Sequence, residues 1–258
     1  MTQQTSLFAL QKLSITLSIL AFSIDINLVA NPLKKAPLSE AESTQAFHSC
    51  VIKKDDNACQ KLINNSAQTI EECTKSTCND MGLIYQNAGF QNKAIGYFKK
   101  AIDLGDTRSY HNLALLYKEM GNIPQAKKYY ELAISKNQFG ARLNLGTLYY
   151  EQKDFSNALK HFEIACTQGN AEAKMIACHN LAVMYDNGEG VKNDYQQAYK
   201  YYKIACDLNY GYACNNLGVL YANGYGTTQN LSKAIELYGK ACKYACNKGC
   251  QNYKTMNR

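Results

Sequence analysis

Apolar residues recur along most of this chain at intervals of three and four positions, and short polar breaks that contain glycine interrupt them. This spacing places the apolar side chains on one face of an α-helix, and the breaks predict turns between successive helices. We therefore expect an all-helical protein after residue 38, with no β-strand.

The helical pattern occurs in five copies, each with small residues and a tyrosine at fixed positions. A Gly or Ala stands three residues before a tyrosine on a first helix, A, and two alanines seven residues apart follow on a second helix, B. Small residues at helical spacing let two helices approach closely, and a period of about 20 to 50 residues indicates stacked helical pairs. The predicted fold is therefore an all-α solenoid of helix-turn-helix repeats. The five sets are Gly82, Tyr85, Ala94, Ala101; Ala114, Tyr117, Ala126, Ala133; Gly146, Tyr149, Ala158, Ala165; Ala182, Tyr185, Ala198, Ala205; and Gly218, Tyr221, Ala234, Ala241.

The period of the repeat changes along the chain. Equivalent apolar residues are 32, 32, 36 and 36 positions apart; they are Met81, Leu113, Leu145, Leu181 and Leu217. In the last two copies, four extra residues form a Gly-rich segment between helices A and B, whereas in the third copy we expect a longer connection after helix B. The early copies resemble tetratricopeptide repeats, and the last two resemble Sel1-like repeats, the variant with a longer loop between its helices.

Eleven cysteines in 258 residues are a high number, and most of them recur at one place in the repeat. One cysteine ends helix B, and a second opens helix A of the next copy. A turn between antiparallel helix ends can bring two Cα atoms within the roughly 4.4 to 6.8 Å that a disulfide requires. Proximity predicts five pairs, although sequence alone does not determine connectivity, and the two N-terminal pairs rest on proximity only. The pairs are Cys50–Cys59, Cys73–Cys78, Cys166–Cys178, Cys206–Cys214 and Cys242–Cys250, with Cys246 left over.

Metal binding is the alternative interpretation of these cysteines. It is disfavoured because the paired cysteines lie in different copies, no C-x-x-C occurs, and no histidine stands at zinc-finger spacing. We therefore expect no metal and no cofactor, and disulfides favour an oxidising compartment.

The N-terminus supports export. Lys12 precedes a ten-residue apolar run, 13–22, which is too short to span a bilayer, and a polar, proline-containing linker follows. A secretory signal peptide explains this pattern, and a buried first helix is the alternative. We expect a secreted or periplasmic protein with no transmembrane helix in its mature chain.

The predicted organisation has four parts. A signal peptide and the start of a linker occupy 1–30, and the linker and N-terminal capping helices occupy 31–78, with helices over about 40–52 and 57–74. Five repeats occupy 79–249, and a C-terminal cap helix occupies 250–258.

The formal charge of +7 changes this picture little. The lysines are scattered over helix B, and the chain has no arginine-rich run or nucleic-acid-binding motif. Solvated helix faces account for this charge, so we expect no nucleic-acid partner.

One polar position on helix A indicates a binding surface. Directly before the equivalent Leu or Met stands Asp80 in the first copy and an asparagine in each later copy and in the cap helix. In the related tetratricopeptide fold this position faces the concave surface, where an amide can both donate to and accept from an extended peptide. The alternative is that these asparagines pair with neighbouring helices, since repeats copy packing residues too, and the sequence leaves both open. The candidate groove residues are Asn112, Asn144, Asn180 and Asn216, with Asn252 in the matching place on the cap helix and His111 and His179 beside the row.

The C-terminal part of the chain resembles one family, the Helicobacter cysteine-rich proteins, which are secreted Sel1-like repeat proteins. The segments 198–206, 206–214 and 216–221 carry the resemblance. It is good over about 160–258 and partial over 79–159, where the loops are short and cysteines are absent. The resemblance implies an extracytoplasmic protein that binds β-lactams or is a weak β-lactamase.

The residues themselves provide no catalytic motif for that activity. The sequence contains no S-x-x-K, S-D-N or K-T-G, and its four histidines are dispersed rather than clustered as zinc ligands. His111 and His179 are better explained as groove residues than as a catalytic pair, so the catalytic residues are unknown. Three classes of function follow: a scaffold that binds a peptide or protein, a binder or hydrolase of β-lactams or cell-wall peptides, and a non-enzymatic adaptor of a signalling or secretion complex.

Overall fold

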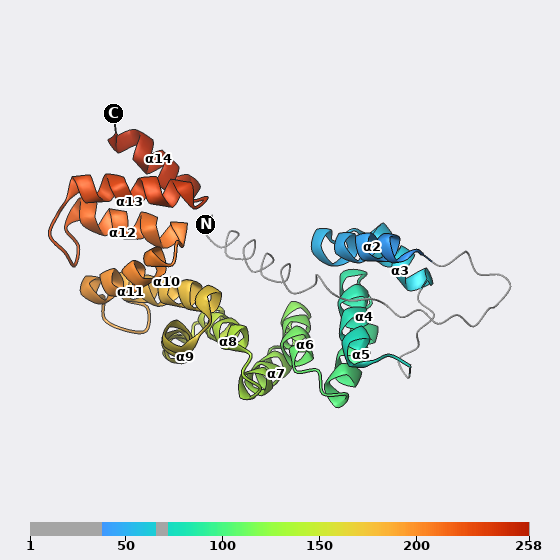
Figure 1. Ribbon diagram of the computed structural model, residues 1–258. Coiled ribbons are helices and arrows are strands. Elements are labelled where there is room, and N and C mark those ends of the chain that lie inside the picture. Colours follow the sequence, from blue (N-terminus) through green and yellow to red (C-terminus); the bar gives the residue numbers. More distant parts are fainter. Residues whose placement is uncertain (1–37, 66–71, 258) are drawn as a thin grey trace. The chain divides into compact units, whose positions relative to one another are not determined.

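The computed structural model describes residues 38–65 and 72–257, and in these ranges it contains thirteen α-helices and no strand (Figure 1). This confirms the predicted all-α repeat fold. The helices are α2 Glu40–Lys53, α3 Asp56–Asn65, α4 Lys75–Asn87, α5 Gln91–Asp103, α6 Arg108–Glu119, α7 Ile123–Ser135, α8 Phe139–Glu151, α9 Phe155–Gln168, α10 Ala171–Asn187, α11 Tyr195–Asp207, α12 Gly211–Asn223, α13 Leu231–Lys243 and α14 Asn247–Met256. The predicted signal peptide lies outside the described residues.

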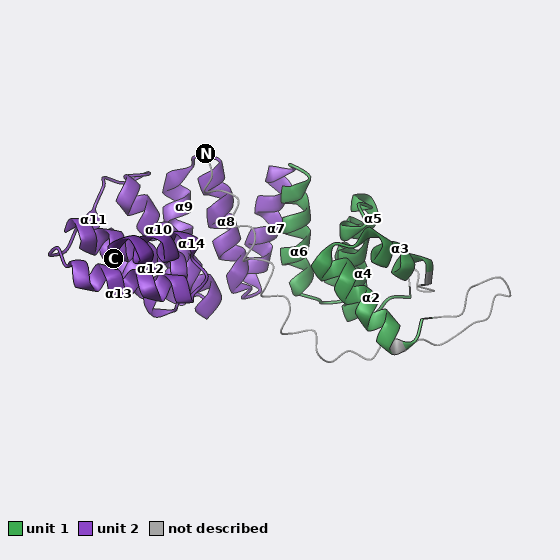
Figure 2. Cartoon of the chain, turned by 90° about the horizontal axis from the view of Figure 1, so that it is seen from above, with its two compact units in different colours: residues 1–121 green, residues 122–258 purple. Residues whose placement is uncertain are grey.

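The chain divides into two compact units (Figure 2). Unit 1, Met1–Gly121, contains α2 to α6, and unit 2, Asn122–Arg258, contains α7 to α14. In the repeats, α4, α6, α8, α10, α12 and α14 are A helices, and α5, α7, α9, α11 and α13 are B helices. No helix in the described part of the chain is long and apolar enough to span a membrane.

In three repeats a glycine on the A helix allows a B-helix ring to pack directly on its backbone. A Cβ atom added to Gly82 would lie 2.5 Å from the Phe98 ring, and one added to Gly218 would lie 2.7 Å from the Tyr238 ring. Real Cβ atoms do not approach that closely, so glycine is required for this packing distance. The repeat alanines on the B helices, such as Ala94 and Ala234, are fully buried in the same contact.

The long loops of the last two repeats fold back on the preceding repeat. Gly188 and Gly224 end α10 and α12 in the left-handed conformation, with φ of 73° and 72°. In the first of these loops, a Cβ on Gly190 would overlap Phe155, the first residue of α9. In the second loop, Tyr225 stacks on Tyr195 with ring centroids 4.8 Å apart. The extra residues therefore link consecutive repeats.

Two sequence-based boundaries need correction. The helix expected over about 57–74 is described over Asp56–Asn65 and does not include 72–74, because Thr74 caps α4 by accepting a hydrogen bond from the backbone of Thr77. The third repeat was expected to have a longer connection after helix B, but only two residues, 169–170, separate α9 from α10. Asn170 caps α10 immediately, so the extra residues form an additional helical turn.

The described residues contain five disulfides, and they join the five pairs expected from proximity. They are Cys50–Cys59, Cys73–Cys78, Cys166–Cys178, Cys206–Cys214 and Cys242–Cys250, with Cα–Cα distances of 4.7, 5.2, 4.8, 4.6 and 4.4 Å. We call the last three junction disulfides, because each joins the end of a B helix to the next A helix. Cys246 is a buried free thiol before α14.

Candidate binding surface on the A helices

Three pairs of neighbouring A helices contact each other within a unit. Helix α4 contacts α6 in unit 1, and in unit 2 α8 contacts α10 and α12 contacts α14. Helices that approach each other while a second layer lies behind them line the inner side of a curved array. The asparagine row, Asn112, Asn144, Asn180, Asn216 and Asn252, lies on these A helices, with Asn112 in unit 1 and the other four in unit 2.

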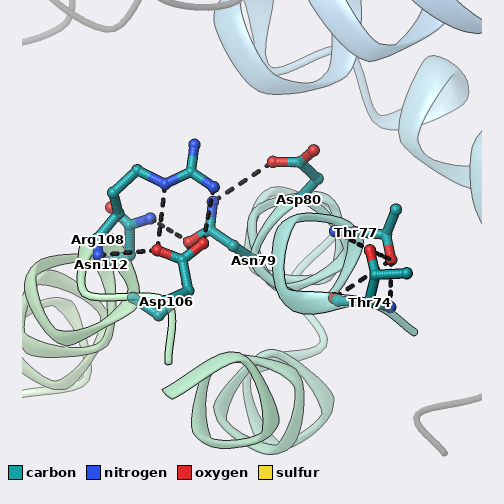
Figure 3. A network of polar contacts seen from close by, with 8 residues as sticks. Thr74, Thr77, Asn79, Asp80, Asp106, Arg108 and Asn112 are labelled. Atoms are coloured by element: carbon teal, nitrogen blue, oxygen red, sulfur yellow. Dashed lines mark hydrogen bonds and ion pairs between the residues drawn. The ribbon is translucent and has the colours of Figure 1, made fainter. Parts of the chain in front are cut away.

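In unit 1 the row asparagine is bonded to the previous A helix (Figure 3). The Nδ2 of Asn112 donates to the Oδ1 of Asn79 at 2.8 Å, and Ser109 Oγ donates to the same oxygen at 2.9 Å. Asn79 is buried, so these two donors satisfy a carbonyl that would otherwise lack water. Asn112 therefore already has a structural role.

A charged cluster lies beside Asn79 in unit 1 (Figure 3). The buried Asp106 accepts from the Nε of Arg108 at 3.1 Å and from its terminal nitrogen at 2.7 Å. Burial raises the pKa of the nearby Asp80, while a hydrogen bond from Asn79 and the charge of Arg108 oppose that rise. The first row position thus differs from the others, because it offers a carboxylate near a guanidinium.

In unit 2 the same bond between A helices recurs. The Nδ2 of Asn252 on α14 donates to the Oδ1 of Asn215 on α12 at 2.8 Å. The Nδ2 of Asn216 on α12 donates to the Nε2 of His179 on α10 at 3.5 Å. In each case a row asparagine donates to the residue that immediately precedes the row position on the previous A helix. We call this contact the inter-repeat hydrogen bond.

His179 lies at the centre of the unit 2 network. The residue is 8% exposed, and its ring packs against Tyr202 and Tyr210, with centroids 5.8 and 5.1 Å away. Burial lowers the pKa of His179 to about 4, so the imidazole is neutral at pH 7. Because Nε2 accepts from Asn216, the ring proton is on Nδ1, which lies 3.4 Å from the Oδ1 of Asn180.

Tyr202 extends the polar contacts beyond His179. Its ring packs against the imidazole, and its hydroxyl donates to Asp186 Oδ2 at 3.0 Å. Burial raises the pKa of Asp186, and the bond from Tyr202 opposes this. No sequence pattern predicted this contact, because Tyr202 occupies the repeat position of the packing rings Phe98 and Phe162.

The structure connects three of the predicted site residues within unit 2. Asn180, Asn216 and His179 form one network in unit 2, and Asn144 is buried on α8 of the same unit. Asn112 and His111 lie on α6 of unit 1, where burial lowers the pKa of His111 to about 4. The described residues contain no group of three or more His, Cys, Asp or Glu side chains that could hold a metal ion.

Comparison with known families supports the repeat assignment. The family model of the Sel1 repeat matches residues 78–106, 141–170, 176–210 and 211–243, and a tetratricopeptide repeat model matches 107–137. The Sel1 assignment thus extends to the first and third repeats, which we expected to resemble tetratricopeptide repeats because their loops are short. No curated protein matches the sequence.

Several solved structures are similar to this chain. A Sel1 repeat protein from Oxalobacter formigenes has 23% identity and a TM-score of 0.59, over 85% of this chain and 89% of that one. A protective antigen of uropathogenic Escherichia coli with an SLR fold has 19% identity and a TM-score of 0.56, over 84% of this chain and 56% of that one. Helicobacter pylori cysteine rich protein B has 24% identity and a TM-score of 0.34, over 61% of this chain and 95% of that one.

Proposed function

Because this chain is a repeat protein composed of Sel1 and tetratricopeptide repeats, we propose that it binds an extended peptide segment of a partner protein along the A helices of unit 2. Repeat arrays commonly hold a partner on the surface that their inner helices line. The observation that carries the proposal is the asparagine row on consecutive A helices, with Asn180 and Asn216 in one network.

The spacing of the row suits an extended backbone. Packed helices lie roughly 8 to 10 Å apart, and an extended chain rises about 3.3 Å per residue. A bound peptide would therefore pass one row asparagine at about every third residue. An amide side chain is neutral and has both donors and an acceptor, which fits backbone groups better than charged side chains.

The proposed compartment is the periplasm or the exterior of the cell. Five disulfides in the described residues support an oxidising environment, because disulfides seldom persist in a reducing cytosol. A partner reached in that compartment is itself exported, which fits an adaptor of a secretion complex as well as a scaffold.

The test is binding to an array of neutral, end-blocked decapeptides. We expect wild-type protein to retain a subset of them, and the triple variant Asn144→Ala, Asn180→Ala, Asn216→Ala to bind that subset more weakly per folded molecule. Circular dichroism melts separate lost binding from lost folding. An array on which wild type retains no peptide, or on which the triple variant matches wild type, would contradict the proposal.

The resemblance to the Helicobacter cysteine-rich proteins supports a second candidate, binding or slow hydrolysis of β-lactams. A β-lactam presents a carbonyl and a carboxylate, which are acceptors of the kind that asparagine amides bind. Purified, oxidised protein incubated with a chromogenic cephalosporin tests this. We expect slow turnover at most. Fast turnover that a chelator abolishes would instead indicate a metal site.

A further inference from the structure

The last two helices of unit 2 carry most of the excess positive charge of that unit. Residues 122–230 contain ten lysines and arginines against nine aspartates and glutamates, whereas residues 231–257, with α13 and α14, contain five lysines and one glutamate. That glutamate, Glu236, is paired with Lys233 at 2.7 Å. The other four lysines form no ion pair among the described residues, and we call them the C-terminal lysine patch: Lys240, Lys243, Lys248 and Lys254.

A disulfide holds the patch residues of the two helices together. Helices α13 and α14 contact each other (Figure 1), and the bond Cys242–Cys250 fixes the last turn of α13 beside the first turn of α14, with Cα atoms 4.4 Å apart. Lys243 directly follows Cys242, and Lys248 stands two residues before Cys250. The charges of the two helix ends therefore lie on one stapled junction.

Helix stability explains only part of this charge. Lys240, Lys243 and Lys254 lie in the last turns of their helices, where a cation interacts favourably with the helix dipole. Lys248 is the second residue of α14, where the same dipole disfavours a cation, and the first turn of α14 contains no acidic side chain that would offset it. The patch thus includes a charge that the fold does not need.

The shape of the surface suits a flat partner. Helix α13 belongs to the layer of B helices behind the A helices, and its buried face includes Ala234 and Ala241. Lys233, Lys240 and Lys243 recur at helical spacing on a face turned away from these alanines, and they extend over about 15 Å. An outward row of charges can meet many anionic groups of a plane at once.

A tyrosine adds an apolar component to the charged surface. A Cβ atom added to Gly239 on α13 would lie 3.2 Å from the ring of Tyr253 on α14, so the ring rests against the α13 backbone. Tyr253 is nevertheless 36% exposed. Tyrosine rings and lysine side chains each combine an apolar body with a polar end, and both are suited to the boundary between water and lipid.

We propose that the C-terminal lysine patch docks the protein on an anionic membrane surface, with the ammonium groups at lipid phosphates and the Tyr253 ring at the interface. Basic side chains close to an anionic bilayer each add to the attraction. A soluble acidic polymer would offer charge to the lysines but no apolar layer to the ring. The peptide surface proposed above involves α8, α10 and α12, so the two surfaces lie on different helices and this inference does not depend on that function.

The first test is flotation of the oxidised protein with vesicles of equal parts phosphatidylglycerol and phosphatidylcholine, with pure phosphatidylcholine vesicles as the reference. We expect wild type to bind the anionic vesicles only, and less tightly as salt rises, because salt screens exposed charges. Replacing three exposed lysines of the patch by glutamine should weaken this binding at least ~10-fold. The triple variant is Lys243→Gln, Lys248→Gln, Lys254→Gln.

A matched control removes the same charge from exposed positions elsewhere in unit 2. It is the triple variant Lys136→Gln, Lys160→Gln, Lys192→Gln. Its vesicle binding should fall by no more than ~2-fold, because these charges lie away from the patch and are screened. Equal losses in the two triple variants would reduce the effect to net charge and overturn the proposal. Wild type that does not float with anionic vesicles would overturn it as well.

A single substitution separates docking from folding. Lys248→Gln removes a charge that the dipole of α14 disfavours, so the melting temperature should not fall. Vesicle binding should nevertheless weaken by roughly threefold. A Lys248→Gln protein that binds vesicles as wild type does would contradict the proposal, because the charge would then serve neither folding nor docking.

The tyrosine distinguishes a lipid surface from a soluble acidic polymer. Tyr253→Ser should weaken vesicle binding by roughly threefold and leave binding to poly-glutamate unchanged, whereas Tyr253→Phe keeps the ring and should bind vesicles nearly as wild type does. Circular dichroism melts identify any variant that has lost its fold. If wild type binds poly-glutamate more tightly than anionic vesicles, the partner is an acidic polymer and the membrane assignment is wrong.

Discussion

The junction between α5 and α6 in unit 1 and the junction between α11 and α12 in unit 2 make the same turn with different chemistry. In the second junction, Cys206 and Cys214 are joined covalently; the matching positions in the first are Ile102 and Tyr110. Where the disulfide is lacking, the buried Asp106 and the half-exposed Arg108 hold the connection instead.

The backbone of the two turns is nevertheless equivalent. Asp106 N donates to Ala101 O at 2.8 Å, and Tyr210 N donates to Ala205 O at 3.0 Å. Each turn also has one residue in the left-handed region, Gly105 with φ of 87° and Asn209 with φ of 67°. The α5–α6 turn forms without a disulfide, so the backbone conformation does not require one. In the α11–α12 turn the cysteines stabilise the same conformation.

The largest expected effect is the loss of the junction disulfides. Each closes a short loop and should contribute roughly 2 to 3 kcal/mol by restricting the unfolded chain. Reduction should lower the melting temperature, and hydrogen exchange should report greater opening of α10 to α14 than of α5 to α8. Intact mass after alkylation without reductant provides the control, and a protein with all eleven thiols free would contradict both the disulfides and the inferred compartment.

Acid should lower the stability of unit 2 even when its disulfides are intact. The pKa of His179 falls from 6.5 in the unfolded chain to about 4 in the buried site, where Tyr202 and Tyr210 surround the ring and Asp186 lies beyond Tyr202. Between these values the unfolded chain binds more protons, so the free energy of unfolding decreases as the pH falls from 6.5 toward 4. The full difference is about 3 kcal/mol.

The variant His179→Gln isolates this contribution. Burial also lowers the pKa values of His111 and His161 to about 4, so the wild-type acid dependence has several sources. Urea unfolding at pH 7 and pH 4.5 should give a smaller difference for His179→Gln than for wild type. Equal differences would mean that His179 is not buried as a neutral ring.

The ion pair of unit 1 should contribute less than a junction disulfide. Asp106→Asn removes the charge-assisted bonds to Arg108, and we expect a loss of about 1 to 3 kcal/mol in urea unfolding. Asp103→Asn, on exposed α5 surface, is the matched control and should change stability little. An Asp106→Asn protein as stable as wild type would show that the turn needs no side-chain support.

Much of the fold could be predicted from sequence, because the same small residues and cysteines recur at equivalent positions of several repeats. The small residues at Gly82 and Gly218 predicted the helix contacts, and the proximity of the cysteines along the chain predicted the five disulfides. The hydrogen-bond partners of the row could not be predicted, because they depend on a side chain in the previous repeat: His179 accepts from Asn216, and Asn215 accepts from Asn252. Asp106 with Arg108 and Tyr202 with Asp186 occur once each, so no periodicity identified them.

The smallest effect tests whether turn and disulfide act independently. Asn209 occupies a left-handed conformation that glycine adopts without a steric penalty, so Asn209→Gly should change the free energy of unfolding by less than ~1 kcal/mol. Gly105→Ala forces a Cβ into the same conformation in unit 1 and should cost about 1 to 2 kcal/mol. Because the disulfide acts mainly on the unfolded chain and the left-handed residue on the folded turn, Asn209→Gly should change stability equally in wild type and in a Cys206→Ala, Cys214→Ala background. The four proteins form a double-mutant cycle. A coupling energy well above ~0.5 kcal/mol in this cycle would mean that the disulfide imposes the conformation of the turn. The similarity of the two junctions would then be a consequence of the covalent bond in the second one.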